Sequence, residues 1–341
     1  SKYSLVDYNR AGIALCEIVS KPDIRSGKEA SEYASEIRRT VRYLGVSDGN
    51  MQEGSLRCDV NISVRKGPNA PFGTKVEIKN MNSFSAIQKA CDYEIARQIE
   101  VYENGGKIFQ ETRLWDEAKQ LTKSMRLKEG SSDYRYFPDP DLGPIEITKA
   151  QQEIWFKELP ELPSKKRNKY VSQFGLSAYD ARVISDEISM ANFFEETVAN
   201  GAEAKLASNW VTSDIVGYLK SNKLSFSELK LSPENLAEMI NMISKNIISG
   251  KIAKEILPEL IQKNISPKKL VEEKGLAMIS DSSSILPIID ELINEHPNEV
   301  QAFKNGKTKL LGFFVGQLMK RTKGKADPKL ANKLLMEKLN S

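Results

Sequence analysis

Residues 56–65 read Leu-Arg-Cys-Asp-Val-Asn-Ile-Ser-Val-Arg, an unbroken alternation of apolar and polar side chains. A period of two is typical of a β-strand with one buried face and one solvated face. After a loop rich in Gly and Pro, residues 66–74, the alternation resumes with Val76 and Ile78 as its apolar members. The two stretches predict an antiparallel strand pair with one buried face and one polar face.

Helical patterns stand on both sides of this strand pair. Ser26 and Glu29 form a capping box, apolar residues then recur at helical spacing, and Gly45 closes the pattern. A second helix is predicted to begin after Ser83 and to end at residues 104–106, which are Asn-Gly-Gly. Its predicted buried face consists of Phe84, Ile87, Cys91, Ile95, Ile99 and Tyr102.

The rest of the chain changes from mixed to helical character. Residues 107–113 and 121–128 predict a further hairpin, and residues 145–147 predict a short strand after a proline-rich turn. Helical patterns follow from residue 149 onward, and the charge pattern changes near residue 274. We therefore predict an α+β chain with three parts: a sheet domain at residues 1–148, an all-helical domain at 149–274 and a small helical tail domain at 275–341.

Composition excludes several kinds of active site. The 341 residues include one histidine, His296, and three scattered cysteines. A His-assisted Ser or Cys nucleophile, a zinc cluster and a His-rich iron site are therefore not expected. The longest nearly apolar run, residues 310–319, is about half of a bilayer span. The pattern indicates a cytosolic protein whose chemistry uses carboxylates, Lys and Arg, the side chains of Mg²⁺-dependent phosphate chemistry and of nucleic-acid contacts.

The net charge of +4 is too small to identify a nucleic-acid-binding protein, but its distribution is uneven. Residues 304–338 hold ten Lys or Arg residues and two acids, whereas residues 281–301 hold five acids and no Lys or Arg. A terminal module with one basic face and an ordinary solvated helix surface explain this pattern about equally well.

The polar face of the strand pair is the first candidate site. It holds Arg57, Asp59, Asn61, Lys75, Glu77 and Lys79, with Glu53 at the entrance of the first strand. Closely spaced acids and bases can hold Mg²⁺ and orient phosphate oxygens. From spacing alone, an exposed sheet face with cross-strand ion pairs explains the pattern better. Asn61, Asn80 and Asn82 are poor strand formers, and Gly54 allows a ligand to approach the backbone; both features favour a site.

Two further clusters carry polar or aromatic side chains. Residues 7–12 form a polar cluster that an ordinary turn into a strand explains well. Residues 133–141 place Tyr, Arg and acids in a proline-rich loop, which suits either stacking on nucleotides or a packed connection. The sequence contains neither a P-loop nor a GxGxxG motif, so standard nucleotide-binding folds gain no support.

Four motifs, in this order, resemble the family of the B subunit of the aspartyl/glutamyl-tRNA(Asn/Gln) amidotransferase. They are residues 6–12 (Val-Asp-Tyr-Asn-Arg-Ala-Gly), 53–61 (Glu-Gly-Ser-Leu-Arg-Cys-Asp-Val-Asn), 77–83 (Glu-Ile-Lys-Asn-Met-Asn-Ser) and 133–138 (Asp-Tyr-Arg-Tyr-Phe-Pro). Residues 306–328 are similar to the tail domain of that family, and the resemblance extends from residue 3 to about residue 338.

The resemblance implies a cradle-like antiparallel sheet domain, a helical domain and a tail that contacts tRNA. It implies ATP and Mg²⁺ as cofactors, and phosphorylation of the side-chain carboxylate of Glu-tRNA(Gln) or Asp-tRNA(Asn). Ammonia from a partner amidase, the A subunit, then displaces the phosphate, and a small C subunit holds the pair together. A bacterial-type cytoplasmic location is implied, and an organellar one stays open. The preference between Gln and Asn formation is not determined by the sequence.

The resemblance and the residue types together suggest roles for individual side chains. The expected catalytic residues are Glu53, Arg57, Asp59 and Lys79, and the expected metal ligands are Glu53 and Glu77. The expected ATP or phosphate ligands are Asn9, Arg10, Lys75, Asn80 and Arg135. The expected tRNA contacts are Lys307, Lys309, Lys320, Arg321, Lys323 and Lys325.

One departure from the family pattern affects these expectations. The chain begins at Ser1, inside what the family has as a central region, and the family's acidic, His-containing strand has no counterpart here. We expect part of the metal and ATP site to lie on that missing part, so whether this chain alone is active stays open. The alternatives are a non-catalytic RNA-binding adaptor and, with less support, an unrelated metal-dependent nucleotidyl-transfer enzyme.

Overall fold

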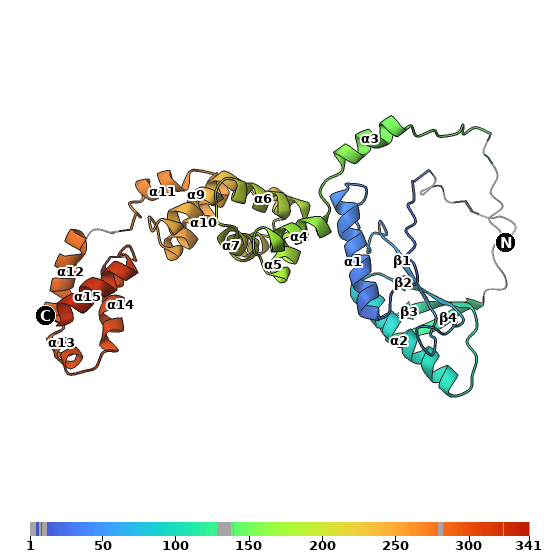
Figure 1. Ribbon diagram of the computed structural model, residues 1–341, viewed down its shortest axis with the longest axis horizontal. Coiled ribbons are helices and arrows are strands. Elements are labelled where there is room, and N and C mark those ends of the chain that lie inside the picture. Colours follow the sequence, from blue (N-terminus) through green and yellow to red (C-terminus); the bar gives the residue numbers. More distant parts are fainter. Residues whose placement is uncertain are drawn as a thin grey trace. The chain divides into compact units, whose positions relative to one another are not determined.

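The computed structural model describes residues 5–6, 8, 12–127, 138, 140–278, 282–322 and 324–340. The chain divides into two compact units, residues 1–159 and 160–341 (Figure 1). Within the described ranges, no helix combines the length and the apolar character that a membrane span requires.

A four-stranded sheet forms the centre of the first unit (Figure 1). Its strands are β1 (Cys58–Ile62), β2 (Val76–Met81), β3 (Glu111–Asp116) and β4 (Leu121–Leu127), in the order β1-β2-β3-β4. The β1–β2 and β3–β4 pairs are antiparallel, as predicted, whereas β2 and β3 are parallel. The connection between β2 and β3 contains a long helix, and such a crossover allows parallel pairing. The α+β class is confirmed, and the sheet itself is mixed rather than purely antiparallel.

Two helices complete the first unit's core. α1 (Gly27–Tyr43) is capped by Ser26 and α2 (Phe84–Glu103) by Ser83, so both predicted starts are confirmed. α2 packs against β1, β2 and β4, and α1 packs against α2. The core between them includes Ile62, Ile78, Ile87 and Trp115.

Three sequence expectations for the first unit need correction. The first strand of the second hairpin is Glu111–Asp116 rather than residues 107–113. Residues 145–147 form no strand, and Ile145 is 90% exposed, because no strand among the described residues lies beside them to pair with. The buried face of α2 is formed by Ala86, Ile87, Ala90, Cys91, Glu94 and Gln98, whereas Ile99 and Tyr102 are exposed. α3 (Lys149–Glu158) follows and buries none of its residues.

The second unit is helical. Its first helices, with the bounds that the structure gives, are α4 (Pro163–Ser172), α5 (Ala178–Ile184), α6 (Ile188–Ala199), α7 (Ala204–Asn209), a π-helical turn (Trp210–Ile215), α8 (Val216–Ser221), a 3₁₀ turn (Phe226–Glu228), α9 (Pro233–Ser244), α10 (Gly250–Lys263) and α11 (Pro267–Glu273). They share one hydrophobic core, whose largest fully buried side chains include Tyr170 and Phe194.

The tail consists of α12 (Ser282–Glu295), α13 (Pro297–Lys304), α14 (Leu310–Arg321) and α15 (Pro328–Asn340). These helices have a hydrophobic core of their own, in which Ile289, Phe314 and Leu335 are fully buried. We refer to residues 282–340 as the tail module below.

Candidate active site on the sheet face

The candidate site lies on the sheet face opposite the buried side chains of β2. Val76 and Ile78 are fully buried, and the residues that alternate with them, Glu77 and Lys79, are only half-buried. On β1, Asp59 and Asn61 are exposed in the same alternating pattern. The period of two thus separates a core face from a polar face, and this part of the sequence expectation agrees with the structure.

Lys79 is the centre of the polar face. Its Nζ donates to Asp59 Oδ2 at 2.5 Å and lies 3.6 Å from Glu77 Oε1. The hydrogen bond with Asp59 raises the pKa of Lys79 above its ordinary value, and the charges of Asp59 and Glu77 add to this effect. Lys79 is therefore a permanently charged ammonium at neutral pH, as neutralisation of phosphate oxygens requires.

A residue that the sequence did not single out holds Glu77. Thr112, on β3, is fully buried, and its Oγ1 donates to Glu77 Oε2 at 2.8 Å. Thr112 is the register partner of Glu77 in the parallel β2–β3 pair. No local signal in the sequence could have indicated this contact, because it depends on the parallel pairing of strands that are 35 residues apart.

Asn80 has a structural task. Its φ angle is +70°, in the left-handed region, and its Nδ2 donates to the carbonyl oxygen of Trp115 at 3.2 Å. The register of β1 and β2 shifts here, between Cys58 and Val60, so Asn80 belongs to a β-bulge. Asn tolerates this conformation better than most residues, which explains a poor strand former at this position.

Glu53 is presented by a tightly hydrogen-bonded loop. Asn50 Oδ1 accepts from the backbone N–H groups of Gln52, at 3.0 Å, and Glu53, at 3.4 Å. The Asn50 carbonyl accepts from the N–H groups of Ser55 and Leu56. Gly54 has a φ of +81°, which favours glycine. Within the described ranges, the exposed Glu53 carboxylate makes no hydrogen bond or ion pair.

The remaining described candidates on this face are solvated. Arg57 and Lys75 are exposed, and neither side chain has a partner among the described residues. Cys58 is not a nucleophile at neutral pH, because burial raises the pKa of its thiol to about 11. The candidates Asn9, Arg10 and Arg135, and most of the Tyr-Arg loop at 133–141, lie outside the described residues.

The donor set suits Mg²⁺ only as a partner of phosphate. Among the described residues, no group of three His, Cys, Asp or Glu side chains is close enough to hold a metal ion. Mg²⁺ in phosphate-transfer sites commonly uses one or two protein carboxylates, with water and phosphate oxygens completing its shell. Two of the carboxylates of this face fit that smaller requirement, Glu77 on β2 and the exposed Glu53 at the entrance of β1, whereas Asp59 is paired with Lys79.

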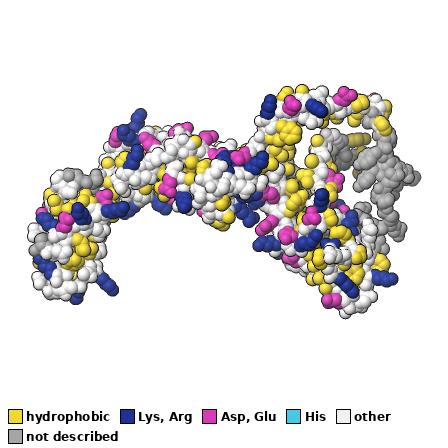
Figure 2. Space-filling model, viewed as in Figure 1, with side chains coloured by type: hydrophobic (Ala, Val, Ile, Leu, Met, Phe, Trp, Pro, Cys, Tyr) yellow, Lys and Arg dark blue, Asp and Glu magenta, His cyan; other side chains and the backbone are white. Residues whose placement is uncertain are grey.

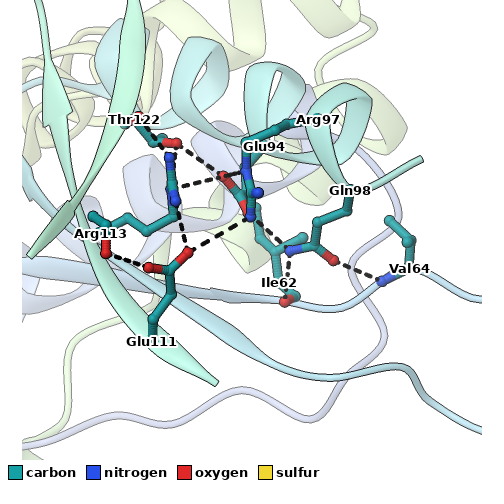
Figure 3. Close-up of polar contacts among 9 residues, drawn as sticks. Ile62, Val64, Glu94, Arg97, Gln98, Glu111, Arg113 and Thr122 are labelled. Carbon is teal, nitrogen blue, oxygen red and sulfur yellow. Dashed lines mark hydrogen bonds and ion pairs between the residues drawn. The ribbon is translucent and has the colours of Figure 1, made fainter. Parts of the chain in front are cut away.

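A buried ionic network on the other side of the sheet was missed by sequence reasoning (Figure 3). Glu94, on α2, is fully buried and accepts from Arg97, at 2.6 Å, and from Thr122 Oγ1, at 2.9 Å. Arg113 donates to Glu111 at 2.6 Å. Burial opposes the ionisation of Glu111, but hydrogen bonds from Ser124 and Arg113 outweigh it, and the pKa of Glu111 is lowered.

Gln98 connects the network to β1. Its Nε2 donates to Glu94 Oε1 at 3.0 Å and to the Ile62 carbonyl at 3.3 Å, and its Oε1 accepts from the Val64 N–H. Figure 3 shows these side chains converging from α2 and the β3–β4 hairpin. Each buried charge has an opposite charge or several donors beside it, as a stable interior requires.

The tail module holds the predicted tRNA contacts. Lys307, Lys309 and Lys320 are exposed, and none has a partner among the described residues. Figure 2 shows basic side chains projecting from this module. Lys325 donates to the Gly275 carbonyl at 2.5 Å, and Lys323 lies outside the described residues.

Arg321 is engaged within the module. Its guanidinium pairs with Glu291, at 3.0 Å, and with Glu295, both on α12. The hydrogen bond with Glu295 raises the pKa of Arg321 and lowers the pKa of Glu295. Lys338 pairs with Asp290 at 2.6 Å. Part of the acidic run thus neutralises part of the basic run.

Comparisons with known proteins cover most of the chain. Residues 1–153 match the family described as GatB/GatE catalytic domain, and residues 192–339 match the family described as GatB domain. The B subunit of the aspartyl/glutamyl-tRNA(Asn/Gln) amidotransferase of Prochlorococcus marinus (strain AS9601) is 99% identical over 341 residues, which are 100% of this chain and 70% of that relative. The protein of the same name from Prochlorococcus marinus (strain MIT 9312) is 95% identical over 340 residues, 100% of this chain and 69% of the relative. The one from Synechococcus sp. (strain CC9605) is 70% identical over 339 residues, 99% of this chain and 69% of the relative.

Proposed function

The chain belongs to the family of the B subunit of the aspartyl/glutamyl-tRNA(Asn/Gln) amidotransferase, a ligase that forms carbon–nitrogen bonds, and we propose that its polar sheet face takes part in carboxylate activation. The observation that supports this role is the ammonium of Lys79 between Asp59 and Glu77, on an open face within the matched catalytic domain. The non-catalytic RNA-binding adaptor is not favoured, because the relatives are named as amidotransferase subunits.

The reaction class explains why such a face is useful. Ammonia cannot displace an oxygen from a free carboxylate, so the carboxylate first needs a leaving group. In the proposed reaction, a side-chain carboxylate oxygen of the misacylated tRNA bonds to the γ-phosphorus of ATP, and ADP leaves. Ammonia then attacks the acyl carbon, and phosphate leaves with the bonding electron pair. Phosphoryl transfer depends on positioning and on positive charge around the phosphate oxygens.

In this proposal the side chains of the polar face divide the work. Lys79, Arg57 and Lys75 neutralise phosphate oxygens, and Asn9, Arg10, Asn80 and Arg135 are further proposed phosphate contacts. Glu53 and Glu77 would hold Mg²⁺, and Asp59 fixes the ammonium of Lys79 at 2.5 Å. When bound, Mg²⁺ supplies charge neutralisation at the phosphates.

The partners and the location follow from the same proposal. We propose that the chain acts with ATP and Mg²⁺ on Glu-tRNA(Gln) or Asp-tRNA(Asn), in a complex with an amidase (the A subunit) and a small C subunit. Aminoacylated tRNA is used in protein synthesis, so we place the reaction in the cytoplasm. The basic side of the tail module, with Lys307, Lys309, Lys320, Lys323 and Lys325, would contact the tRNA backbone. Arg321, which was expected among these contacts, pairs with Glu291 and Glu295 and would mainly hold the module together.

The test uses Glu53→Gln in the full-length protein within the assembled amidotransferase. We expect ATP-dependent phosphorylation of Glu-tRNA(Gln) to fall about 10²–10³-fold, by analogy with the loss of one charge-stabilising group. Glutaminase activity and assembly should stay intact. Glu103→Gln, at the exposed end of α2, makes the same chemical change away from the site and should leave the rate unchanged. Normal amidation kinetics in Glu53→Gln would refute the assignment.

A further inference from the structure

Two threonines of the β3–β4 hairpin donate to glutamates on opposite faces of the sheet. Thr112, on β3, donates to Glu77 Oε2 at 2.8 Å on the polar face. Thr122, on β4, donates to Glu94 Oε2 at 2.9 Å on the face covered by α2. Both threonines are buried, with 0% and 3% exposure, and each donates its hydroxyl to a glutamate. Thr122 Oγ1 also accepts from Arg113 Nε at 2.8 Å, and the two glutamates lie on opposite faces of the sheet.

The Thr112 hydroxyl holds the Glu77 carboxylate in one orientation. Thr112 is β-branched and fully buried, so its χ1 angle has little freedom and its hydroxyl is fixed before any ligand binds. Glu77 is its register partner in the parallel strand pair, and Glu77 Oε1 lies 3.6 Å from Lys79 Nζ. The carboxylate is therefore restrained by a hydroxyl at one oxygen and by an ammonium near the other.

We propose that Thr112 is a positioning residue for Glu77, which it presents to a Mg²⁺–phosphate ligand. The inference rests on the proposed function, because it takes Glu77 as a metal ligand. A hydrogen-bonded group behind a carboxylate ligand fixes its direction, and the loss of such a group commonly weakens metal binding about 10-fold or more. A purely structural Thr112 would contribute only to the stability of the strand pair.

The experiment measures metal affinity and stability separately. Mn²⁺ replaces Mg²⁺ as the probe, and its binding to the full-length protein in the assembled complex is followed by electron paramagnetic resonance, with a non-hydrolysable ATP analogue present. Thr112→Val keeps the shape but removes the donor, and Thr112→Ser keeps the donor. Thr122→Val is the matched control, and thermal unfolding is recorded for every variant.

We expect Thr112→Val to weaken Mn²⁺ binding about 10-fold. Thr112→Ser, which keeps the hydroxyl, should bind Mn²⁺ within about 3-fold of the parent protein. Thr122→Val should lower the unfolding temperature without changing the Mn²⁺ affinity. If Thr112→Val fails to assemble, Thr112→Ala takes its place, because it removes the hydroxyl without adding a methyl group. Unchanged Mn²⁺ affinity in the Thr112 variants, with a loss in Glu77→Gln, overturns the positioning role alone. Unchanged affinity in Glu77→Gln itself refutes Glu77 as a ligand and the inference with it.

Discussion

Asn80 and Glu195 each have a role that depends on contacts distant in sequence. Asn80 combines a φ of +70° with a hydrogen bond to the Trp115 carbonyl. Glu195, on α6, accepts from Lys166 at 2.8 Å, from Tyr170 at 2.9 Å and from Lys169 at 3.1 Å. In both cases the residue type alone is ambiguous, and the partners decide whether the side chain supports the fold or remains available to a ligand.

Substitution of Asn80 separates its structural role from the proposed phosphate contact. Asn80→Ala should lower the free energy of unfolding by about 1–3 kcal/mol, from left-handed strain and the lost hydrogen bond. Asn80→Gly avoids the strain and should cost only about 1 kcal/mol. Urea denaturation measures both. Equal losses in the two variants would contradict the conformational role, whereas a stable Asn80→Gly with reduced phosphorylation would support the phosphate contact.

Glu195 should contribute to the stability of the second unit in a way that depends on pH. Burial opposes its ionisation, but hydrogen bonds from Lys166, Tyr170 and Lys169 outweigh burial and lower its pKa below the ordinary 4.5. A carboxyl group whose pKa is lower in the folded state stabilises the protein at pH values above its unfolded-state pKa. This stabilisation is lost as the pH falls through the folded-state pKa. Glu195→Gln should therefore cost about 3 kcal/mol at pH 7, since it leaves the buried Lys166 ammonium without its carboxylate.

The measurement for Glu195 is urea denaturation as a function of pH. The difference between the parent protein and Glu195→Gln should shrink steadily as the pH falls below 4.5. The neighbouring exposed Glu196 provides the control, because Glu196→Gln should cost little at any pH. A difference that stayed constant from pH 7 to pH 3 would show that the Glu195 charge does not carry the effect.

At the scale of the elements, α2 shows which features of a helix can be predicted from the sequence and which cannot. Its start at Ser83 and its end at Asn104 were predictable, because caps are local signals. Its buried face was predicted wrongly in part, since Glu94 and Gln98 are fully buried and Ile99 is 43% exposed. Apolar periodicity assigns polar residues to solvent, whereas here the β3–β4 hairpin supplies the partly buried Arg113 and the buried Thr122 as partners.

The sheet shows the same limit. The alternation along β1 and β2 and the polar face with Asp59, Glu77 and Lys79 followed from the sequence, because a period of two is local. The parallel pairing of β2 with β3, and with it the Thr112–Glu77 contact, could not be predicted, because strand order depends on the whole core. The buried ionic network and the parallel pair are both long-range features of the same unit.

The buried ionic network of Figure 3 should lose much of its contribution to stability when one of its charges is removed. Glu94→Leu should destabilise the first unit by about 3–5 kcal/mol, because Arg97 and Arg113 would keep partly buried charges without this carboxylate. The double variant Glu94→Leu/Arg113→Met removes both signs of charge and should recover part of that loss. Urea denaturation of the two single variants and the double variant gives the coupling. Additive losses would contradict a coupled network.

At the scale of the whole molecule, folding redistributes the charge of the tail module. The sequence shows a basic run and an acidic run next to each other, but α12 pairs its acids Glu291 and Glu295 with Arg321, and Asp290 with Lys338. The positive charge that remains available to a large anion is then carried by side chains such as Lys307, Lys309 and Lys320. Arg321 consequently has a structural task that its position in the basic run did not reveal.

The tail module should determine the salt dependence of tRNA binding. Each Lys–phosphate contact releases counterions, so neutralising three contacts should reduce the slope of log affinity against log salt by about 2–3. We expect this flattening in the triple variant Lys307→Gln/Lys309→Gln/Lys320→Gln, together with weaker binding. A variant of the complete subunit from which residues 276–341 are deleted should show the same flattening of the slope to a larger extent. In amidation kinetics the effect should appear in KM for tRNA far more than in kcat, because these contacts hold the tRNA body rather than the reacting carboxylate.

The controls for the tail module separate charge from fold. Lys220, at the end of α8, and Lys223 and Lys230, in the connections between α8 and α9, are exposed, so their neutralisation changes net charge equally and should leave the slope unchanged. Arg321→Gln should lower the thermal stability of the tail module more than the slope, because it removes the pairs with Glu291 and Glu295. The measurement is tRNA affinity across a salt series for each variant. Equal slopes in the parent protein and in the Lys307/Lys309/Lys320 variant would mean that this basic surface is only solvated, and that tRNA is held elsewhere in the complex.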